Sequence, residues 1–317
     1  MELTSLEMCA GAGGQALGLE RAGFLHEGLI EVDKHACATL RLNRPKWRVF
    51  EEDLEEFDGR PFKGIDLLAG GLPCPPFSVA GKQLGKKDER NLFPAAIRLV
   101  DEIRPRAVMI ENVRGILGAP FETYRRYVAG RFRKLGYESG WQLVNAADFG
   151  VSQVRPRAVF VAIKKERADG FEWPALHAGK PPTVGACLYD LMSEKKWRGA
   201  RAWRDQASAI APAIVGGSKK HGGPDLGPTR AKQAWADLGV NGHLVADNPP
   251  EREFIGMPIL TVKMVARLQG FPDGWQISGA RTQAYRQVGN AFPPPVAHAV
   301  ASEIAACFGA RRFAKAG

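Results

Sequence analysis

Short apolar runs alternate with amphipathic patterns through the first half of the chain. The runs predict strands at Leu3–Met8, Gly28–Val32, Ile65–Ala69, Ala107–Ile110, Trp141–Ala146 and Ala158–Ile163. Residues spaced as on a helix predict helices at Gly14–Ala22, Lys34–Asn43, Pro94–Ile103 and Tyr124–Leu135. Because helices separate the strands, and the strands lack clean polar alternation, the pattern indicates a buried, mainly parallel sheet. The expected fold class is therefore α/β, with a doubly wound sheet.

The composition changes after Lys165. Residues 166–258 are rich in Gly, Pro, Trp and basic side chains, and their periodicity is weak. Regular helical pattern returns at Thr261–Gln269 and Pro294–Ala306. We therefore expect a large domain over residues 1–165, a smaller irregular domain over 166–258, and a C-terminal segment over 259–317 that returns to the first domain.

The chain carries 44 Lys and Arg against 34 Asp and Glu, a formal net charge of +10. Residues 195–232 hold nine Lys or Arg and two Asp, so much of the excess lies in one stretch. This charge permits an anionic partner such as nucleic acid, although a generally basic enzyme would look the same. Without a signal peptide or an apolar run long enough to span a membrane, the expected location is the cytoplasm.

The five cysteines stand far apart, at positions 9, 37, 74, 187 and 307. No C-x-x-C pair and no nearby His cluster accompanies them, so the spacing favours neither a zinc site nor a disulfide framework. No metal is expected. The odd count leaves room for one reactive thiol.

A glycine-rich turn, MCAGAGG (8–14), joins the first strand to the first helix. Such a turn lets a ligand approach backbone amides at a helix N-terminus. Glu31 lies about twenty residues on, where an acid can accept hydrogen bonds from a ribose diol, and Asp53 is placed to meet an adenine edge. The pattern fits NAD, FAD or S-adenosylmethionine, and it also fits a tight turn that uses glycine only for its backbone freedom.

A second motif, GGLPCPPFSVAGKQ (70–83), follows the strand Ile65–Ala69. Its prolines forbid a helix and fix the loop around Cys74. Cys74 should thus lie at the carboxyl end of a strand, where open α/β sheets bind ligands. A lone cysteine is more often a small buried apolar residue, so the context has to decide.

Six motifs occur in a fixed order: MCAGAGG, LPCPPFS, IENVRG (110–115), QVRPR (153–157), LTVKMVARLQGFP (260–272) and AYRQVGNAF (284–292). In this order they resemble the DNA cytosine-5 methyltransferase family of bacterial restriction-modification systems. The resemblance covers residues 3–165 and 258–308. It implies a Rossmann-like domain that uses S-adenosylmethionine, with residues 166–258 as the target-recognition domain.

The resemblance also implies the chemistry. The Cys74 thiolate would add to carbon 6 of a flipped-out cytosine, which makes carbon 5 nucleophilic enough to take the methyl group. Glu111 would hydrogen-bond N3, and Arg155 or Arg157 would reach O2. Taken singly, these three residues could equally be surface or capping groups, and only the ordered motifs favour catalysis.

The remaining site residues are expected by position in the motifs. Cofactor contacts are expected from Cys9, Gly11, Ala12, Gly13, Gly14, Glu31, Val32, Asp53, Leu54, Gly71, Pro73, Leu92, Asn290 and Ala291. DNA contacts are expected from the loop after the nucleophile (GKQLGKKDERN, 81–91) and from the Gly-rich segment 216–230, namely at Lys82, Gln83, Arg90, Lys219, Lys220, His221 and Arg230. The resemblance implies double-stranded DNA as the partner, and we expect a monomer that does not physically require a companion restriction endonuclease.

The match is imperfect at four positions. Cys9 stands where the family usually has Phe, Pro75 where it often has Gln, and Pro258 and Met264 where it usually has Arg and Glu.

Three other functions compete with this interpretation: cytosine-5 methylation of transfer RNA, a catalytically inactive DNA-binding regulator, and a nicotinamide-dependent oxidoreductase. The last would leave LPCPPFS and IENVRG unexplained.

Overall fold

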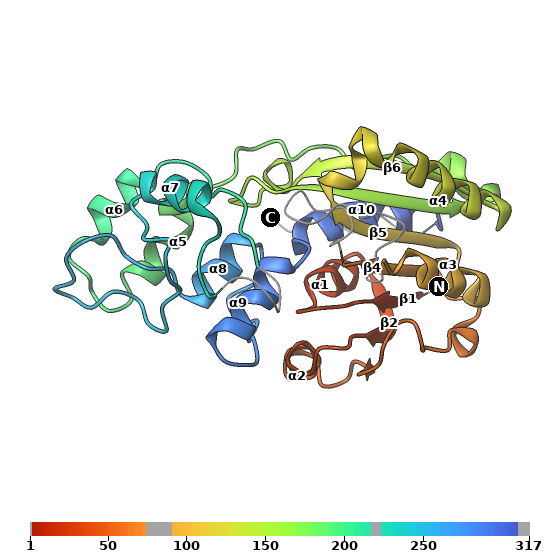
Figure 1. Cartoon of the computed structure of the whole chain (residues 1–317), viewed down its shortest axis with the longest axis horizontal. Helices are drawn as coiled ribbons and strands as arrows, with labels where there is room; N and C mark the ends of the chain where they lie inside the picture. The colour runs from red at the N-terminus through yellow and green to blue at the C-terminus, as the bar shows by residue number, and fades with distance from the viewer. Residues whose placement is uncertain (1, 74–90, 217–222, 310–317) are drawn as a thin grey trace. The chain divides into compact units, whose positions relative to one another are not determined.

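The computed structural model describes residues 2–73, 91–216 and 223–309 (Figure 1). The chain divides into two compact units. Unit 1 comprises Met1–Val144, Pro156–Ala175 and Val296–Gly317, and unit 2 comprises Asn145–Arg155 and Leu176–Pro295. Compared with the boundaries expected at residues 166 and 259, residues 166–175 belong to unit 1, and residues 145–155 and 259–295 belong to unit 2.

Unit 1 contains a seven-stranded sheet in the order β3-β2-β1-β4-β5-β7-β6. The strands are β1 (Leu3–Met8), β2 (Phe24–Ile30), β3 (Val49–Phe50), β4 (Leu67–Gly71), β5 (Ala107–Val113), β6 (Tyr137–Asn145) and β7 (Pro156–Lys164). Neighbours from β3 to β5 are parallel, and β7 runs antiparallel to β5. The predicted mixed α/β sheet is confirmed, with the carboxyl ends of β1, β2, β4 and β5 at one edge.

Helices cover both faces of this sheet. Leu6 and Met8 of β1 pack in a large apolar cluster with α3 (Phe93–Ile103) and α4 (Glu122–Lys134). Leu29 of β2 belongs to another cluster, with Ala16 of α1 (Gly14–Arg21) and Leu40 of α2 (Lys34–Asn43). Since Leu29 and its neighbour Ile30 point to opposite faces, the sheet is doubly wound. Helix α10 (Pro294–Ala306) ends the described chain.

Unit 2 contains more regular structure than its weak periodicity predicted. Its helices are α5 (Val184–Met192), α6 (Ala200–Gln206), α7 (Thr229–Asp237), α8 (Val262–Leu268) and α9 (Arg281–Asn290). Arg267 joins two of them: its Nη2 donates to Oδ2 of Asp190 on α5 at 2.9 Å, and its Nε donates to Oδ1 of Asp273 at 2.7 Å. The expectation of an irregular segment was wrong for α5, α6 and α7.

Helix α8 begins without the acidic residue that the family usually places in its first turn. The Thr261 hydroxyl accepts from the Met264 amide at 3.3 Å, and the Thr261 amide lies 3.4 Å from the Met264 sulfur. A thioether is a weak acceptor. Met264 therefore closes the capping box in place of a carboxylate.

Within the ranges that the structure describes, no helix combines the length and apolar character that crossing a bilayer requires.

Candidate active site

The glycine-rich turn leaves β1 through three residues in the left-handed region. Cys9 has φ +50°, Gly11 +54° and Gly13 +81°. Gly13 is the N-cap of α1, and Ala10 donates its amide to the Ile30 carbonyl at 3.0 Å, which ties the turn to β2. A Cβ added at Gly11 would meet no atom within 4 Å, so the space beside this backbone is open. The turn thus leaves open space beside the backbone at Gly11, where a ligand can approach closely.

Glu31 closes the far side of this turn. Its Oε2 accepts from the Gly11 amide at 2.7 Å, and its Oε1 accepts from the Asp33 amide at 2.8 Å. The side chain is buried, and this burial raises the pKa of the Glu31 carboxyl above its usual value. The next side chain, Val32, is 65% exposed, which is unusual for a large apolar residue and leaves a surface against which a flat ring can pack.

Asp53 lies in an exposed turn after β3. Its Oδ1 accepts from the Glu55 amide at 2.9 Å, while the neighbouring Leu54 is buried in the core. Leu92, the N-cap residue of α3, is half-buried against the same core cluster. Leu54 and Leu92 therefore pack in one apolar cluster with α3, and Asp53 directly precedes Leu54 in the chain.

Glu111 and Arg157 form a buried ion pair near the end of β5. Arg157 Nε lies 2.8 Å from Glu111 Oε1, and the side chains are 16% and 8% exposed. The antiparallel register of β5 and β7 brings them together, since Arg157 lies opposite Val113, two residues beyond Glu111. A guanidinium and a carboxyl group held together in this way can present donors of fixed geometry to a polar ring.

Gln15 is a polar residue of this region that the sequence prediction missed. It is the second residue of α1, it is 3% exposed, and neither its Oε1 nor its Nε2 has a hydrogen-bond partner among the described residues. A Cβ added at Gly71 would lie 3.5 Å from Glu111 Oε2 and 4.0 Å from Gln15 Oε1. Both polar groups therefore flank Gly71, the last residue of β4. The sequence signal that could have identified Gln15 was a polar amide side chain in the otherwise apolar first turn of α1.

Arg155 has different surroundings from Arg157. It is fully buried in unit 2, where Nη1 donates to the Ile214 carbonyl at 2.7 Å and Nη2 donates to the Gly289 and Ala291 carbonyls at 2.7 and 3.1 Å. Gln153, also fully buried, accepts from the Ile214 amide at 2.9 Å and donates to Gln269 Oε1 at 2.6 Å. Of the two arginines expected to reach O2, Arg155 thus binds main-chain carbonyls of unit 2, whereas Arg157 lies beside Glu111.

The other predicted site residues are distributed as follows. Ala12 and Gly14 are buried in the turn and α1, Gly71 is half-buried, and Pro73 is exposed. In unit 2, Asn290 is exposed, Ala291 is buried, and Arg230 is exposed on α7. Cys74, Lys82, Gln83, Arg90, Lys219, Lys220 and His221 lie outside the described residues. Over the described ranges no three His, Cys, Asp or Glu residues cluster as metal ligands.

Comparison with known proteins gives a consistent result. The profile of a family described as C-5 cytosine-specific DNA methylase matches residues 3–306. Type II methyltransferase M.NgoMIV of Neisseria gonorrhoeae is 55% identical, with 96% of this chain and 97% of that protein covered. Type II methyltransferase M.NaeI of Lentzea aerocolonigenes is 53% identical over 96% of this chain and 75% of its own length.

Solved structures share the fold at lower identity. A variant of Spodoptera frugiperda DNMT2 superposes with a TM-score of 0.67 at 17% identity, covering 95% of this chain and 99% of that one. The S. pombe Dnmt2 methyltransferase gives 0.65 at 18%, covering 97% and 100%. The family profile and the close relatives each span nearly the whole chain, and the chain belongs to the C-5 cytosine-specific DNA methylase family.

Proposed function

We propose that the chain is a site-specific methyltransferase that moves a methyl group from S-adenosylmethionine to carbon 5 of a flipped-out cytosine in double-stranded DNA. The observation that carries this proposal is the buried Glu111–Arg157 pair beside Gly71, three residues before Cys74 in the sequence. Cys74 forms a covalent bond to carbon 6 of the ring, and the bond breaks when carbon 5 loses its proton. The base has to leave the duplex for any of these groups to reach it.

In this assignment the Glu111 carboxyl group, carrying or sharing a proton, donates a hydrogen bond to N3, and Arg157 donates to O2. Both contacts strengthen as negative charge develops on the ring, so they lower the barrier more than they tighten binding. The ion pair holds the two groups in place before substrate arrives, because Arg157 Nε already lies 2.8 Å from Glu111 Oε1. Arg155 has no such role, since its guanidinium binds carbonyls within unit 2.

The donor fits the space beside the glycine-rich turn. Glu31 accepts the ribose hydroxyls, Val32 and Cys9 pack against the adenine, and Asp53 meets its exocyclic amine. The smaller Cys9, where the family usually has Phe, leaves more of this packing to the exposed Val32 side chain. S-adenosylmethionine supplies an electrophilic methyl group, and the protein supplies orientation.

Unit 2 is the part of the chain to which we assign target recognition. Its segment 195–232 carries most of the excess positive charge, which suits phosphate binding. Arg230 is exposed on α7 and can reach a base edge. We infer a bacterial modification enzyme of a type II system that acts as a monomer on DNA, in keeping with the relatives M.NgoMIV and M.NaeI.

The test is a labelling and trapping experiment. Tritiated donor should label double-stranded DNA and leave transfer RNA unlabelled, and bisulfite sequencing of a plasmid carrying the gene should then give the target sequence. DNA containing 5-fluorocytosine should trap the wild-type protein covalently, because fluorine blocks the elimination, and it should not trap Cys74→Ala. Labelling of RNA alone, or trapping of Cys74→Ala, would contradict the assignment.

A further inference from the structure

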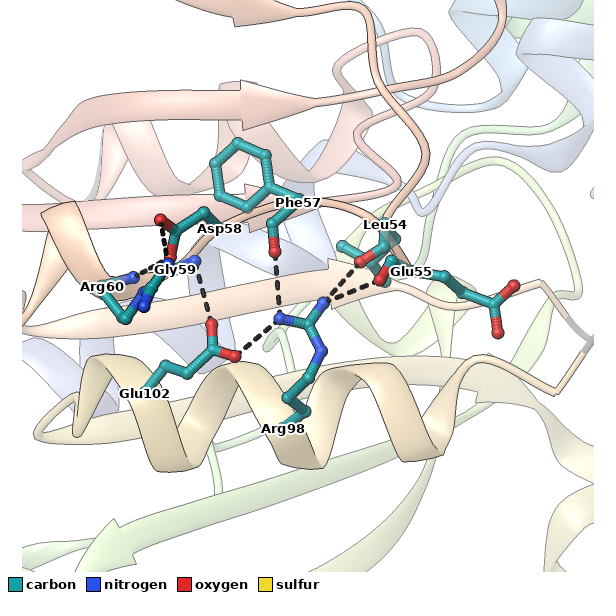
Figure 2. Close-up of polar contacts among 8 residues, drawn as sticks. All are labelled: Leu54, Glu55, Phe57, Asp58, Gly59, Arg60, Arg98 and Glu102. Carbon is teal, nitrogen blue, oxygen red and sulfur yellow. Dashed lines mark hydrogen bonds and ion pairs between the residues drawn. The ribbon is translucent and has the colours of Figure 1, made fainter.

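The segment that follows Asp53 lies along α3 and is fastened to it by one arginine (Figure 2). Arg98 Nη1 donates to the Phe57 carbonyl at 3.0 Å, and its Nη2 donates to the carbonyls of Leu54 and Glu55 at 3.1 and 3.2 Å. One guanidinium thus binds three main-chain carbonyls within four residues of the segment. Its planar arrangement of donors suits such a contact, and a lysine ammonium could not reproduce it.

Glu102 lies one helical turn farther along α3 and completes the contact. Its Oε1 accepts from Arg98 Nη1 at 2.7 Å, and its Oε2 accepts from the Gly59 amide at 3.0 Å. A Cβ at Gly59 would lie 2.9 Å from side-chain atoms of both Leu99 and Ile103, so glycine permits this close approach to the helix. The segment is therefore fixed at both ends, through Leu54 and through Gly59.

This attachment determines where Asp53 lies. The Asp53 carbonyl accepts from the amides of Glu56 and Phe57 at 3.1 Å each, so the turn is continuous with the carbonyls that Arg98 binds. Loops of this kind are usually the mobile part of an α/β domain. Here the anchor is α3, and Leu92 at the N-cap of α3 belongs to the same proposed donor site.

We propose that Arg98 and Glu102 are positioning residues for the adenosine half of the donor site. They contact no reactant and act by holding Asp53 and Leu54 in the geometry that adenine requires. The inference rests on the proposed function, which places the donor beside Glu31, Val32 and Asp53. It goes beyond that function by assigning an effect on donor affinity to two half-buried side chains of α3 that do not touch the donor.

The first test substitutes Arg98 by Met, with Arg126→Met as the matched control. Arg126 also pairs with a glutamate four residues away, Glu122 on α4, but that pair is exposed and no carbonyl bond from Arg126 is among the described contacts. Arg98→Met should raise the Kd of S-adenosylhomocysteine, measured by calorimetry, by roughly tenfold. It should raise the donor KM equally while kcat at saturating donor stays within about twofold. Arg126→Met should leave the Kd of S-adenosylhomocysteine, the donor KM and kcat unchanged.

The second test is a double-mutant cycle with Asp53→Ala. If Arg98 acts through the Asp53 turn, the double variant should bind donor no more weakly than the weaker of the two single variants. Fully additive losses, or an unchanged Kd in Arg98→Met, would overturn the inference. Arg98→Lys keeps a charge next to Glu102 but cannot bind three carbonyls, so it carries the test if Arg98→Met does not fold, and circular dichroism confirms that each variant is folded at the assay temperature.

Glu31→Ala distinguishes a failure of the proposed donor site from a failure of the positioning role of Arg98. If Glu31→Ala and Asp53→Ala both leave donor affinity unchanged, the donor binds elsewhere and both the site and this inference are wrong. If those two variants weaken binding and Arg98→Met does not, the donor site stands and the positioning role alone is refuted.

Discussion

Replacing Arg155 by Met should destabilise the protein strongly while leaving most of the turnover of each folded molecule. The guanidinium donates to the carbonyls of Ile214, Gly289 and Ala291, and the Arg155 side chain is fully buried. Methionine fills similar volume but donates nothing. The Ala291 carbonyl keeps its hydrogen bond from Gln269 Nε2. The Ile214 and Gly289 carbonyls lose the Arg155 donor at a cost of roughly 1–3 kcal/mol each, so we expect a total loss of about 3–5 kcal/mol.

Urea unfolding measures this loss directly. With a slope of about 2–3 kcal/mol per molar urea, a loss of that size lowers the midpoint by roughly 1–2 M. Tryptophan fluorescence is a suitable signal, because Trp197, Trp203, Trp235 and Trp275 all lie in unit 2, where Arg155 is buried. Turnover should be expressed per folded molecule, from donor-binding stoichiometry in the same preparation.

The companion variant is Arg157→Met, which removes the proposed contact to O2. Its turnover per folded molecule should fall on the order of 100- to 1000-fold, as expected for the loss of one donor to developing negative charge. The reasoning would be refuted if Arg155→Met unfolded at the wild-type urea concentration and lost turnover as Arg157→Met does. In that case Arg155 would have the catalytic role that the sequence pattern alone allowed.

Three further predictions concern single residues of unit 1. Glu31→Ala should raise the donor Kd by a factor that corresponds to about 1.5–3 kcal/mol, and equal donor affinities of wild type and Glu31→Ala in calorimetry would contradict this. The donor affinity of the wild type should also fall as pH drops through the raised pKa of Glu31, and Glu31→Gln should lack this pH dependence. Gln15→Leu should raise the free energy of unfolding by about 1–2 kcal/mol, because it removes a buried amide that has no partner among the described residues, yet it should lower turnover; an unchanged melting temperature would argue against it. Burial lowers the pKa of His26 to about 4, and its neutral ring lies 3.0 Å from both Ser5 Oγ and the Ala16 carbonyl. The stability that this neutral ring contributes is complete above its unfolded pKa near 6.5 and should be lost, by roughly 3 kcal/mol, as pH falls toward 4. The difference in urea midpoint between wild type and His26→Asn should therefore shrink over that range.

The sequence pattern predicted the bounds of an element correctly where the residues that start and end the element lie in or next to it in the chain. Strand β1 and helices α2 and α10 have the predicted bounds. Helix α2 shows why: Asp33 accepts hydrogen bonds from the amides of His35 and Ala36, an N-cap that the sequence displays directly before the helical pattern. Strand β2 begins at Phe24, four residues before the predicted start, because its first half alternates between buried and exposed positions and offers no apolar run.

The sequence pattern did not predict helices α7 and α5, for two different reasons. Helix α7 buries only Trp235, so its sequence TRAKQAWAD has too few apolar positions for a visible period. Helix α5 has apolar residues but lies beside α6, and a Cβ at Gly185 would lie 2.1 Å from the Arg204 carbonyl oxygen. That close approach explains why position 185 is a glycine.

The QVRPR motif shows why spacing alone could not assign the two arginines. Residues two apart in an extended chain point to the same side, so Arg155 and Arg157 are equivalent in the sequence. The carbonyl groups that Arg155 binds lie 59 to 136 residues away, and no local pattern encodes them. Pro156 begins β7, so Arg157 is fixed by pairing with β5 while Arg155 precedes the strand. The motif therefore supplies one arginine to each unit, and loss of either should lower activity in a cell for a different reason: an unfolded protein in one case and a slow chemical step in the other.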